Sequence, residues 1–316
     1  MGLTIGVDLG GTKVAAAVVD ESGTIVARTR QETPSTGADA TVGAILAAVK
    51  GLREQHPDVE AVGVGAPGFI DERRSTVLFL TNLAGWRHRP LRAELEQALG
   101  LPVVVENDAN VAAWGEAVYG AGRGEDYLVC VTVGTGIGGG IIVGGQLYRG
   151  RFGVAAEVGH FRVEPNGRPC GCGNRGCWEQ YCSGNALVRE ARWRAAEDRE
   201  GAALMLSYGD GSPEGINGLD ITDAARRGDR VAIASFESVG RWLGQGMADL
   251  AAILDPGCFV IGGGVSEAGD LLLEPARRTF AEVLTGRAYR PLAEIRQATL
   301  GNDAGVVGAA DLARHL

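Results

Sequence analysis

Residues 6–23 read GVDLGGTKVAAAVVDESG, which is a short apolar segment, a glycine turn, a second apolar segment and a second turn. Short apolar runs bounded by such turns are typical of β-strands. Residues 131–147, VTVGTGIGGGIIVGGQL, repeat the same order. The repeat indicates two related α/β halves that each present a glycine turn, and a cleft between two such halves is a common place for a small ligand.

The same reading extends along the chain as an alternation of strands and helices. Apolar runs predict strands at Ile5–Leu9, Val14–Asp20, Thr24–Arg30, Val59–Val64, Pro102–Val105, Tyr127–Val133, Ile141–Val143, Cys258–Ile261 and Ala293–Ala298. Helical periodicity predicts helices at Ala38–Gln55, Leu91–Leu99, Ala109–Tyr119, Asn185–Arg199, Asp220–Arg227, Arg230–Leu254, Leu271–Leu284 and Ala304–His315. Strands that alternate with helices in this way predict an α/β fold.

Composition narrows the class of protein. The 316 residues are 45% hydrophobic and 22% charged, which is typical of a globular protein, and the length suggests two domains. The net charge of −9 disfavours broad binding to nucleic acid or to an anionic membrane surface, because both need a basic face.

The lack of a recognisable signal peptide or membrane span and the pattern of cysteines favour a cytoplasmic protein. The N-terminal MGLTIGVDLGG lacks a basic region and a cleavage site, so a first strand is expected there rather than a signal peptide. No apolar run approaches the roughly 18 residues of a membrane span. Three of the six cysteines cluster between Cys170 and Cys177, and Cys130 and Cys258 lie in apolar runs. This usage fits a reducing cytoplasm.

The first glycine turn, Asp8-Leu-Gly-Gly-Thr-Lys13, places backbone amides, a hydroxyl and an ammonium group together. Such a turn can bind phosphate through its N–H groups, and Asp8 can hold Mg²⁺ directly or through water. A plain hairpin turn explains the same residues equally well, because glycine is common in hairpins. The residues alone leave both interpretations open.

The second glycine turn, GTGIGG at residues 134–139, has the G-x-G-x-x-G spacing of dinucleotide sites. That motif opens a helix, whereas an apolar strand follows here, so no dinucleotide site is expected. A phosphate-contacting hairpin turn with Thr135 as hydroxyl donor remains. A third cluster, Gly262-Gly263-Gly264, is either a loop that a base or ribose approaches closely or a tight strand-to-helix turn.

Residues 103–108, VVVEND, end a buried strand and place Asn107 and Asp108 at the head of a helix. Ligands bind at strand ends in open α/β sheets, and an aspartate there can accept a proton from a substrate hydroxyl during phosphoryl transfer. The alternative is that either residue serves only as a helix N-cap.

Residues 157–180, EVGHFRVEPNGRPCGCGNRGCWEQ, contain a candidate metal site. The residue types and spacing suit tetrahedral zinc at His160, Cys170, Cys172 and Cys177. Four protein ligands leave no open position, so the zinc is expected to be structural. Glu157 and Glu179 flank this set, and a metal would fix where both carboxylates point. The alternative is a reduced cysteine loop without metal.

These motifs together resemble those of the ROK family of sugar kinases and repressors, above all its bacterial ATP-dependent glucokinases. The resemblance rests on residues 8–13, 106–108, 134–136, 157–160 and 170–180, and it extends from Ile5 to the last helix. It implies an actin-like ATPase fold, hexokinase-type and ribonuclease H-like, with two lobes and a central cleft. The small lobe is expected at residues 1–108 plus 302–316, and the large lobe, carrying the zinc loop, at 109–301.

The resemblance also implies roles for individual residues. Asp108 matches the catalytic base. The positions implied to contact or lie near the sugar are Gly68, Asn82, Asn107, Asp108, Glu157, His160 and Glu179. The positions implied for ATP and its Mg²⁺ are Asp8, Gly10, Gly11, Thr12, Lys13, Gly134, Thr135, Gly136, Gly263 and Gly264. His160 is thus expected to contact both the zinc and the sugar.

The expected function is ATP-dependent phosphorylation of glucose to glucose 6-phosphate, with Asp108 taking the proton of the sugar 6-hydroxyl. Glu157 and Glu179 are expected to accept hydrogen bonds from hydroxyls on the far side of the ring. One alternative is a kinase for mannose, fructose, allose or N-acetylmannosamine. Polyphosphate is disfavoured as donor, because the resemblance is to ATP-using members.

A second alternative is a sugar-responsive repressor of the same family. It is disfavoured because the first strand starts within a few residues of Met1, which leaves no room for an N-terminal DNA-binding domain. A homo-oligomer, either a dimer or a tetramer, is the expected assembly. The segment 201–218 is expected to be a surface loop without an assigned role.

Overall fold

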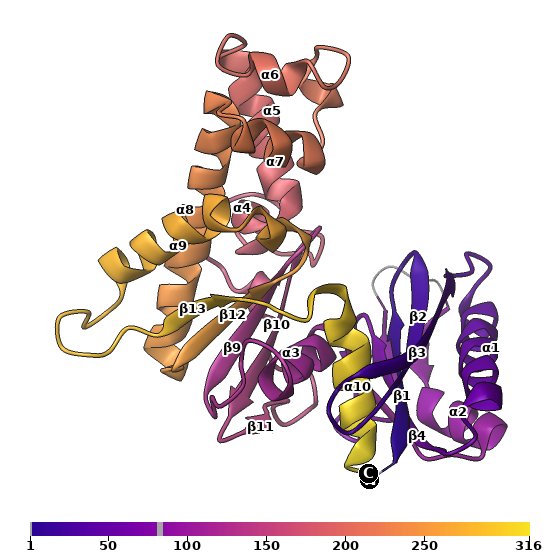
Figure 1. Ribbon diagram of the computed structural model, residues 1–316. Helices are drawn as coiled ribbons and strands as arrows, with labels where there is room; N and C mark the ends of the chain where they lie inside the picture. The colour runs from indigo at the N-terminus through magenta and orange to yellow at the C-terminus, as the bar shows by residue number, and fades with distance from the viewer. Residues whose placement is uncertain (1, 81–84) are drawn as a thin grey trace. The chain divides into compact units, whose positions relative to one another are not determined.

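The computed structural model describes residues 2–80 and 85–316 and divides into two compact units (Figure 1). Unit 1 consists of Met1–Cys130, Gly139–Ala156 and Ala298–Leu316. Unit 2 consists of Val131–Gly138 and Glu157–Gln297. Asn82, which the resemblance places near the sugar, lies outside the described residues.

The main sheet of unit 1 has the strand order β3-β2-β1-β4-β8. Its strands are β1 (Leu3–Leu9), β2 (Lys13–Val19), β3 (Ile25–Glu32), β4 (Val59–Ala66) and β8 (Val103–Asn107). The strand β2 pairs antiparallel with β1 and β3, whereas β4 pairs parallel with both β1 and β8. The carboxyl ends of β1, β4 and β8 therefore lie at one edge of the sheet.

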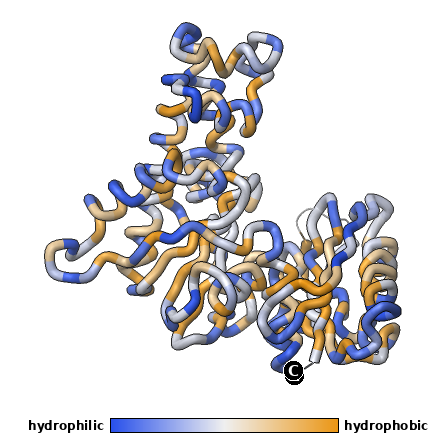
Figure 2. Tube along the Cα trace, viewed as in Figure 1, coloured by the Kyte–Doolittle hydropathy of each residue, from blue (hydrophilic) through white to orange (hydrophobic). Residues whose placement is uncertain are grey.

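Helices cover both faces of this sheet. The residues Ile5, Val7 and Leu9 of β1 share an apolar core with α1 (Ala38–Gln55) and α2 (Leu91–Leu99). On the other face, α10 (Ala304–Arg314) approaches so closely that a Cβ at Gly6 would lie 1.8 Å from the Val306 carbonyl oxygen. Only glycine fits there. Figure 2 shows apolar colour concentrated along the buried strands and polar colour on the loops.

The helix α3 (Asp108–Val118) packs on α10 within unit 1. A Cβ at Gly308 of α10 would lie 1.8 Å from the Val111 carbonyl oxygen of α3, so the two backbones are nearly in contact. The compact units thus do not separate at residue 108. The expected division into a small lobe, residues 1–108 plus 302–316, and a large lobe, residues 109–301, stays a prediction.

The second five-stranded sheet has the order β11-β10-β9-β12-β13. Its strands are β9 (Leu128–Val133), β10 (Ile137–Val143), β11 (Gln146–Leu147), β12 (Cys258–Gly262) and β13 (Glu294–Gln297). The start of β10 differs from the predicted Ile141, because Gly138, Gly139 and Gly140 continue the strand. A Cβ at Gly140 would lie 2.3 Å from the Ala113 Cβ, so glycine here permits close packing of α3 rather than a turn.

Unit 2 otherwise consists mainly of helices. The longer ones are α5 (Gly184–Glu197), α7 (Gly218–Arg226), α8 (Arg230–Leu254) and α9 (Asp270–Val283). The helices α8 and α9 pack closely, and a Cβ at Gly244 would lie 2.3 Å from the Ala276 carbonyl oxygen. The short helices α4 (Glu179–Cys182) and α6 (Ala203–Leu206) were not predicted. Segment 201–218 contains α6 and buries Met205 and Ile216, so it is not simply a surface loop.

A small sheet in unit 1 was also not predicted. It has the order β5-β6-β7, formed by Phe69–Ile70, Val77–Phe79 and Arg87–Arg89. Four short 3₁₀ turns complete the described elements: η1 (Val158–His160), η2 (Pro213–Gly215), η3 (Gly264–Ala268) and η4 (Gly301–Asp303). Within residues 2–80 and 85–316, no helix combines the length and apolar character that crossing a membrane would require.

Candidate active site and metal centre

The residues Asn107 and Asp108 lie where β8 ends and α3 begins. The side chain of Asn107 is the N-cap of α3, since its Oδ1 accepts a hydrogen bond of 3.0 Å from the Asn110 amide. Its Nδ2 donates to the Gly68 carbonyl oxygen at 3.0 Å and to Asp108 Oδ1 at 3.1 Å. The Ala109 amide also donates to Asp108 Oδ1, at 2.9 Å. Capping therefore falls to Asn107, which in turn orients the Asp108 carboxylate.

Burial shifts the titration of both carboxylates at this edge of unit 1. Burial raises the pKa of Asp108, although hydrogen bonds from Ala109 and Asn107 act in the opposite direction. For Asp8, at the end of β1, burial and then the charge of Asp108 raise the pKa to about 6, while Lys13 lowers it. The two carboxylates therefore interact electrostatically, and the charge of Asp108 makes ionisation of Asp8 harder. A raised pKa suits a general base, and a second carboxylate beside it suits a divalent cation.

The first glycine turn is a hairpin between β1 and β2. The Gly10 amide donates to the Lys13 carbonyl oxygen at 2.8 Å. The side chain of Thr33, just after β3, donates to the Gly10 carbonyl oxygen at 2.7 Å. The residues Gly11 and Thr12 are exposed at the tip. The hairpin is thus confirmed, while its binding of phosphate stays a prediction.

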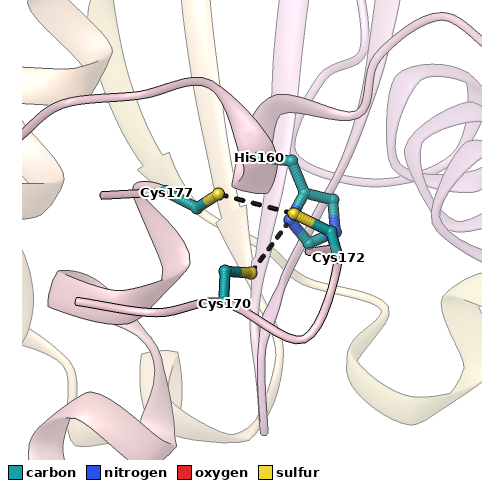
Figure 3. A group of neighbouring side chains, drawn as sticks. All are labelled: His160, Cys170, Cys172 and Cys177. Carbon is teal, nitrogen blue, oxygen red and sulfur yellow. Dashed lines mark hydrogen bonds between the residues drawn. The ribbon is translucent and has the colours of Figure 1, made fainter. Parts of the chain in front are cut away.

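The four candidate metal ligands of unit 2 point toward one another (Figure 3). Their ligand atoms all lie within 4.8 Å of one another. The Cys170 Sγ lies 3.6 Å from His160 Nδ1, and the Cys172 Sγ lies 3.6 Å from the Cys177 Sγ. Zinc–sulfur bonds of about 2.3 Å in a tetrahedron place two sulfur atoms about 3.8 Å apart. The donor atoms therefore fit zinc in both chemistry and spacing.

The backbone of this loop explains how the ligands come together. His160 ends the 3₁₀ turn η1, and the Cys170 amide donates to the Asn174 carbonyl oxygen at 2.9 Å, which closes a tight turn around Cys172. Burial, helped by the nearby Glu179, raises the pKa of the Cys170 thiol to about 12. A bound metal would favour the thiolate there, since coordinated thiols lose their protons.

The glutamates Glu157 and Glu179 lie near opposite ends of residues 157–180, which we call the metal loop, and Glu179 contacts the candidate ligands directly. Its Oε1 accepts a hydrogen bond of 2.9 Å from the Cys170 thiol and lies 3.8 Å from His160 Nδ1. The side chain of Glu157 is exposed, and its carbonyl oxygen accepts from the His160 amide at 3.0 Å. A metal would therefore hold the backbone of Glu157 through His160, but the hydrogen bond from Cys170 to Glu179 needs the thiol proton that coordination removes.

The second glycine turn lies against Glu179 within unit 2. A Cβ at Gly136 would be 2.6 Å from Glu179 Oε2, and the Gly134 carbonyl oxygen accepts from the Gly184 amide, at the start of α5, at 2.7 Å. The intervening Thr135 is exposed. A strand follows the turn, as predicted, so the sequence match to a dinucleotide motif is not one in structure.

The third glycine cluster forms a strand-to-helix turn, in which β12 ends at Gly262 and η3 begins at Gly264. The intervening Gly263 has φ of +82°, and a Cβ there would lie 2.6 Å from the Val133 carbonyl oxygen. Glycine is therefore required for backbone reasons alone. The predicted proximity of Gly263 and Gly264 to adenosine stays a prediction.

Sequence reasoning missed a buried ionic cluster directly behind Asp108. The carboxylate of Glu106 forms ion pairs with Arg74 at 2.9 Å and Arg149 at 2.6 Å. The signal in the sequence was a charged residue at the end of the otherwise apolar run VVVE. Its arginine partners are far away in the chain, and no local pattern identifies them.

Comparisons of this chain with a family model, with known proteins and with solved structures bear on the family to which it belongs. The model of the ROK family matches residues 4–315. The chain is 54% identical over 315 residues to a glucokinase of Streptomyces coelicolor, covering 100% of this chain and 98% of that protein. A ROK family glucokinase from Streptomyces griseus, solved in complex with glucose and AMPPNP, is 58% identical and matches with a TM-score of 0.89, over 100% of both chains. The xylose repressor of Bacillus subtilis is 29% identical, over 98% of this chain and 77% of the repressor.

Proposed function

The chain belongs to the ROK family, with its actin-like α/β fold, and on that premise we propose that it is an ATP-dependent glucokinase. The observation that carries the proposal is the full-length identity to glucokinases of Streptomyces, one of them solved with glucose and an ATP analogue. Transfer of the γ-phosphoryl group of ATP to the 6-hydroxyl of glucose would yield glucose 6-phosphate.

In unit 1, Asp108 is proposed as the general base for the sugar hydroxyl. Its raised pKa and the hydrogen bonds that orient its Oδ1 support this role. Asp8 is proposed to hold Mg²⁺, which would neutralise charge on the phosphates. The hairpin tip at Gly10, Gly11, Thr12 and Lys13 is proposed to contact those phosphates through N–H groups and the ammonium group. Positioning and charge neutralisation supply most of the catalysis in such reactions.

In unit 2, Glu157, His160 and Glu179 are proposed to accept or donate hydrogen bonds to the sugar hydroxyls. A sugar that lacks such a hydroxyl would leave one of these polar groups covered by the sugar without a partner, which discriminates against it. Zinc held by His160 and the three cysteines would fix the backbone of the segment that carries Glu157, His160 and Glu179, which we call the sugar wall. Four protein ligands give the metal no open position for chemistry. The turn 134–136 is proposed to contact phosphate, and Gly263 and Gly264 to lie beside adenosine.

The decisive test is a steady-state panel with ATP and Mg²⁺ that compares kcat/KM for glucose, mannose, fructose, allose and N-acetylmannosamine. Glucose should give the highest value. A higher value for another hexose would replace the substrate, and the resemblance to an N-acetylmannosamine kinase, 34% identical, makes that sugar the most informative competitor. Absence of phosphorylation together with tight, sugar-sensitive binding to operator DNA would favour a repressor instead.

We also propose a homo-oligomer, either a dimer or a tetramer, in a reducing cytoplasm where thiolate ligands persist. Light scattering after gel filtration measures the mass directly. A monomer at micromolar concentration would contradict the assembly. Elemental analysis of the purified protein is expected to find one zinc per chain.

A further inference from the structure

The side chain of Glu106 is a buried carboxylate two residues before the proposed base. It lies at the penultimate position of β8, and its side chain is only 1% exposed. Two cations meet its Oε2: Arg74 Nε at 2.9 Å and Arg149 Nε at 2.6 Å. A buried carboxylate is costly unless it is paired and hydrogen-bonded, and these arginines supply the pairing.

The other oxygen of Glu106 is bonded to the catalytic end of the strand. Its Oε1 accepts from the Asn107 amide at 2.9 Å and from Asn110 Nδ2 at 3.1 Å. Asn107 in turn donates its side-chain amide to Asp108 Oδ1. One carboxylate thereby joins both arginines to the residue that orients Asp108.

The arginines are themselves held by the loop after β5. Arg149 donates from both terminal nitrogens, to the Asp71 carbonyl oxygen at 2.8 Å and to the Glu72 carbonyl oxygen at 3.0 Å. Arg74 has φ of +54°, a strained conformation for a residue with a side chain, and its carbonyl oxygen accepts from the Val105 amide at 3.1 Å. The loop is closed by the Asp71 carboxylate, which accepts from the amides of Ser75 and Thr76.

We propose that Arg149 and Arg74, acting through Glu106, are positioning residues for phosphoryl transfer that fix Asn107 and thereby the Asp108 carboxylate. The proposal rests on the proposed function. Proton abstraction demands placement within a fraction of an ångström, and a base is placed that accurately only when its supporting residues are locked. Arg149 pairs with Glu106 while its two terminal nitrogens donate to separate carbonyl oxygens, and the single rotating ammonium of lysine does not reproduce this planar geometry.

A merely structural ion cluster would leave the chemistry of Asp108 unchanged, so the test is a pH profile with a matched control. Arg149→Met removes one arm of the cluster. Arg314→Met is the control, because Arg314 is a similarly buried arginine of unit 1, with a side chain 6% exposed against 10% for Arg149. It bonds the carbonyl oxygens of Gly2, Val19 and Asp20, at the edge of the sheet opposite to Asp108.

In the full-length folded chain, the substitution Arg149→Met is expected to lower kcat about 100-fold while the KM for glucose changes less than about threefold. The acid limb of the kcat profile should move to higher pH, since Asp108 loses part of the hydrogen bonding that counters its burial. Asp8 on β1 also faces Asp108, and Lys13 faces Asp8. All three groups are unchanged in both variants, so a difference between the profiles reports the ion cluster of Glu106. Arg149→Lys should give an intermediate kcat.

Arg314→Met is expected to lose stability but keep kcat within about threefold and the same acid limb. The positioning role is wrong if Arg149→Met keeps wild-type kcat, or if both variants lose equal activity with unshifted profiles. Should Arg149→Met not fold, Arg149→Lys carries the same comparison. A wild-type protein that phosphorylates no hexose would remove the proposed function, and the positioning role with it, before any variant is made.

Discussion

The carboxylate of Asp8 should lower the stability of the folded protein at neutral pH, and Asp8→Asn should therefore stabilise it. Burial and the charge of Asp108 raise the pKa of Asp8 from 3.8 to about 6. Ionising this group is consequently harder in the folded protein than in the unfolded chain. Asparagine has nearly the same shape and carries no charge, so the variant escapes that cost.

The sign and size follow from proton linkage. A folded-state pKa above the unfolded value means that the group's favourable contribution is complete below pH 3.8 and is lost as the pH rises through about 6. At 1.36 kcal/mol per pH unit, the full loss is about 3 kcal/mol, and partial exposure of Asp8 reduces it to about 2–3 kcal/mol. Above pH 7 the loss should be constant.

Urea denaturation of both proteins between pH 4 and pH 7.5 measures the effect. The free energy of unfolding of Asp8→Asn minus that of wild type should grow by about 2 kcal/mol across this range. Asp20→Asn, in the turn after β2, is the control, because hydrogen bonds from Ser22 and Thr24 lower the pKa of Asp20, so its stabilising contribution is nearly complete at pH 4 and the Asp20→Asn difference should stay nearly flat across this range. A difference for Asp8→Asn that is flat with pH would refute the reasoning, as would a variant less stable than wild type at pH 7.5.

Three further predictions concern the proposed base of unit 1 and the metal loop of unit 2. Asp108→Asn should keep glucose binding in calorimetry but lower kcat about 10³-fold, because the proton acceptor is gone; activity within a few-fold of wild type would exclude Asp108 as the base. Cys172→Ser should lower the zinc content measured by elemental analysis and raise the KM for glucose, and an unchanged KM in zinc-free protein would argue against a metal-supported sugar wall. Gly246→Ala should raise the KM for glucose while zinc is retained, because a Cβ there would lie 2.2 Å from the Trp178 ring, next to Glu179; wild-type KM would show that Trp178 does not support Glu179.

Elements with strong local signals were predictable from the sequence. The helix α8 spans Arg230–Leu254 as expected, with Asp229 as its N-cap, and α2 spans Leu91–Leu99 because Gly100 ends it in the left-handed conformation. The small sheet β5-β6-β7 was missed, since strands of two or three residues have no measurable periodicity. The start of β10 was misplaced because glycines that signal a turn serve here to admit α3.

The same contrast holds for the site. The clustering of the four candidate metal ligands was predictable, because their spacing within one loop is itself the signal. Which of Asn107 and Asp108 caps α3 was not predictable, since it depends on which oxygen accepts the Asn110 amide. The pairing of Glu106 with Arg149 depends on burial between distant segments, which a single sequence does not encode in any local pattern.

The metal loop can be held by two kinds of contact, a bound metal and the packing of Trp178 on α8, and the hydrogen bonds of Trp178 show that the second does not depend on the first. Its amide donates to the Phe161 carbonyl oxygen at 2.9 Å, and its indole donates to the Trp242 carbonyl oxygen of α8 at 2.7 Å. These bonds use none of the four candidate metal ligands, so the backbone beside Glu179 is anchored to α8 without any metal. If zinc is bound, its loss should therefore increase the mobility of the side chains of the sugar wall and weaken glucose binding, while the backbone beside Glu179 stays anchored. Displacement of Trp178 should move Glu179 itself while all four candidate ligands remain. Cys172→Ser and Gly246→Ala together therefore distinguish a sugar wall that depends on the metal from one that depends on the contact with α8.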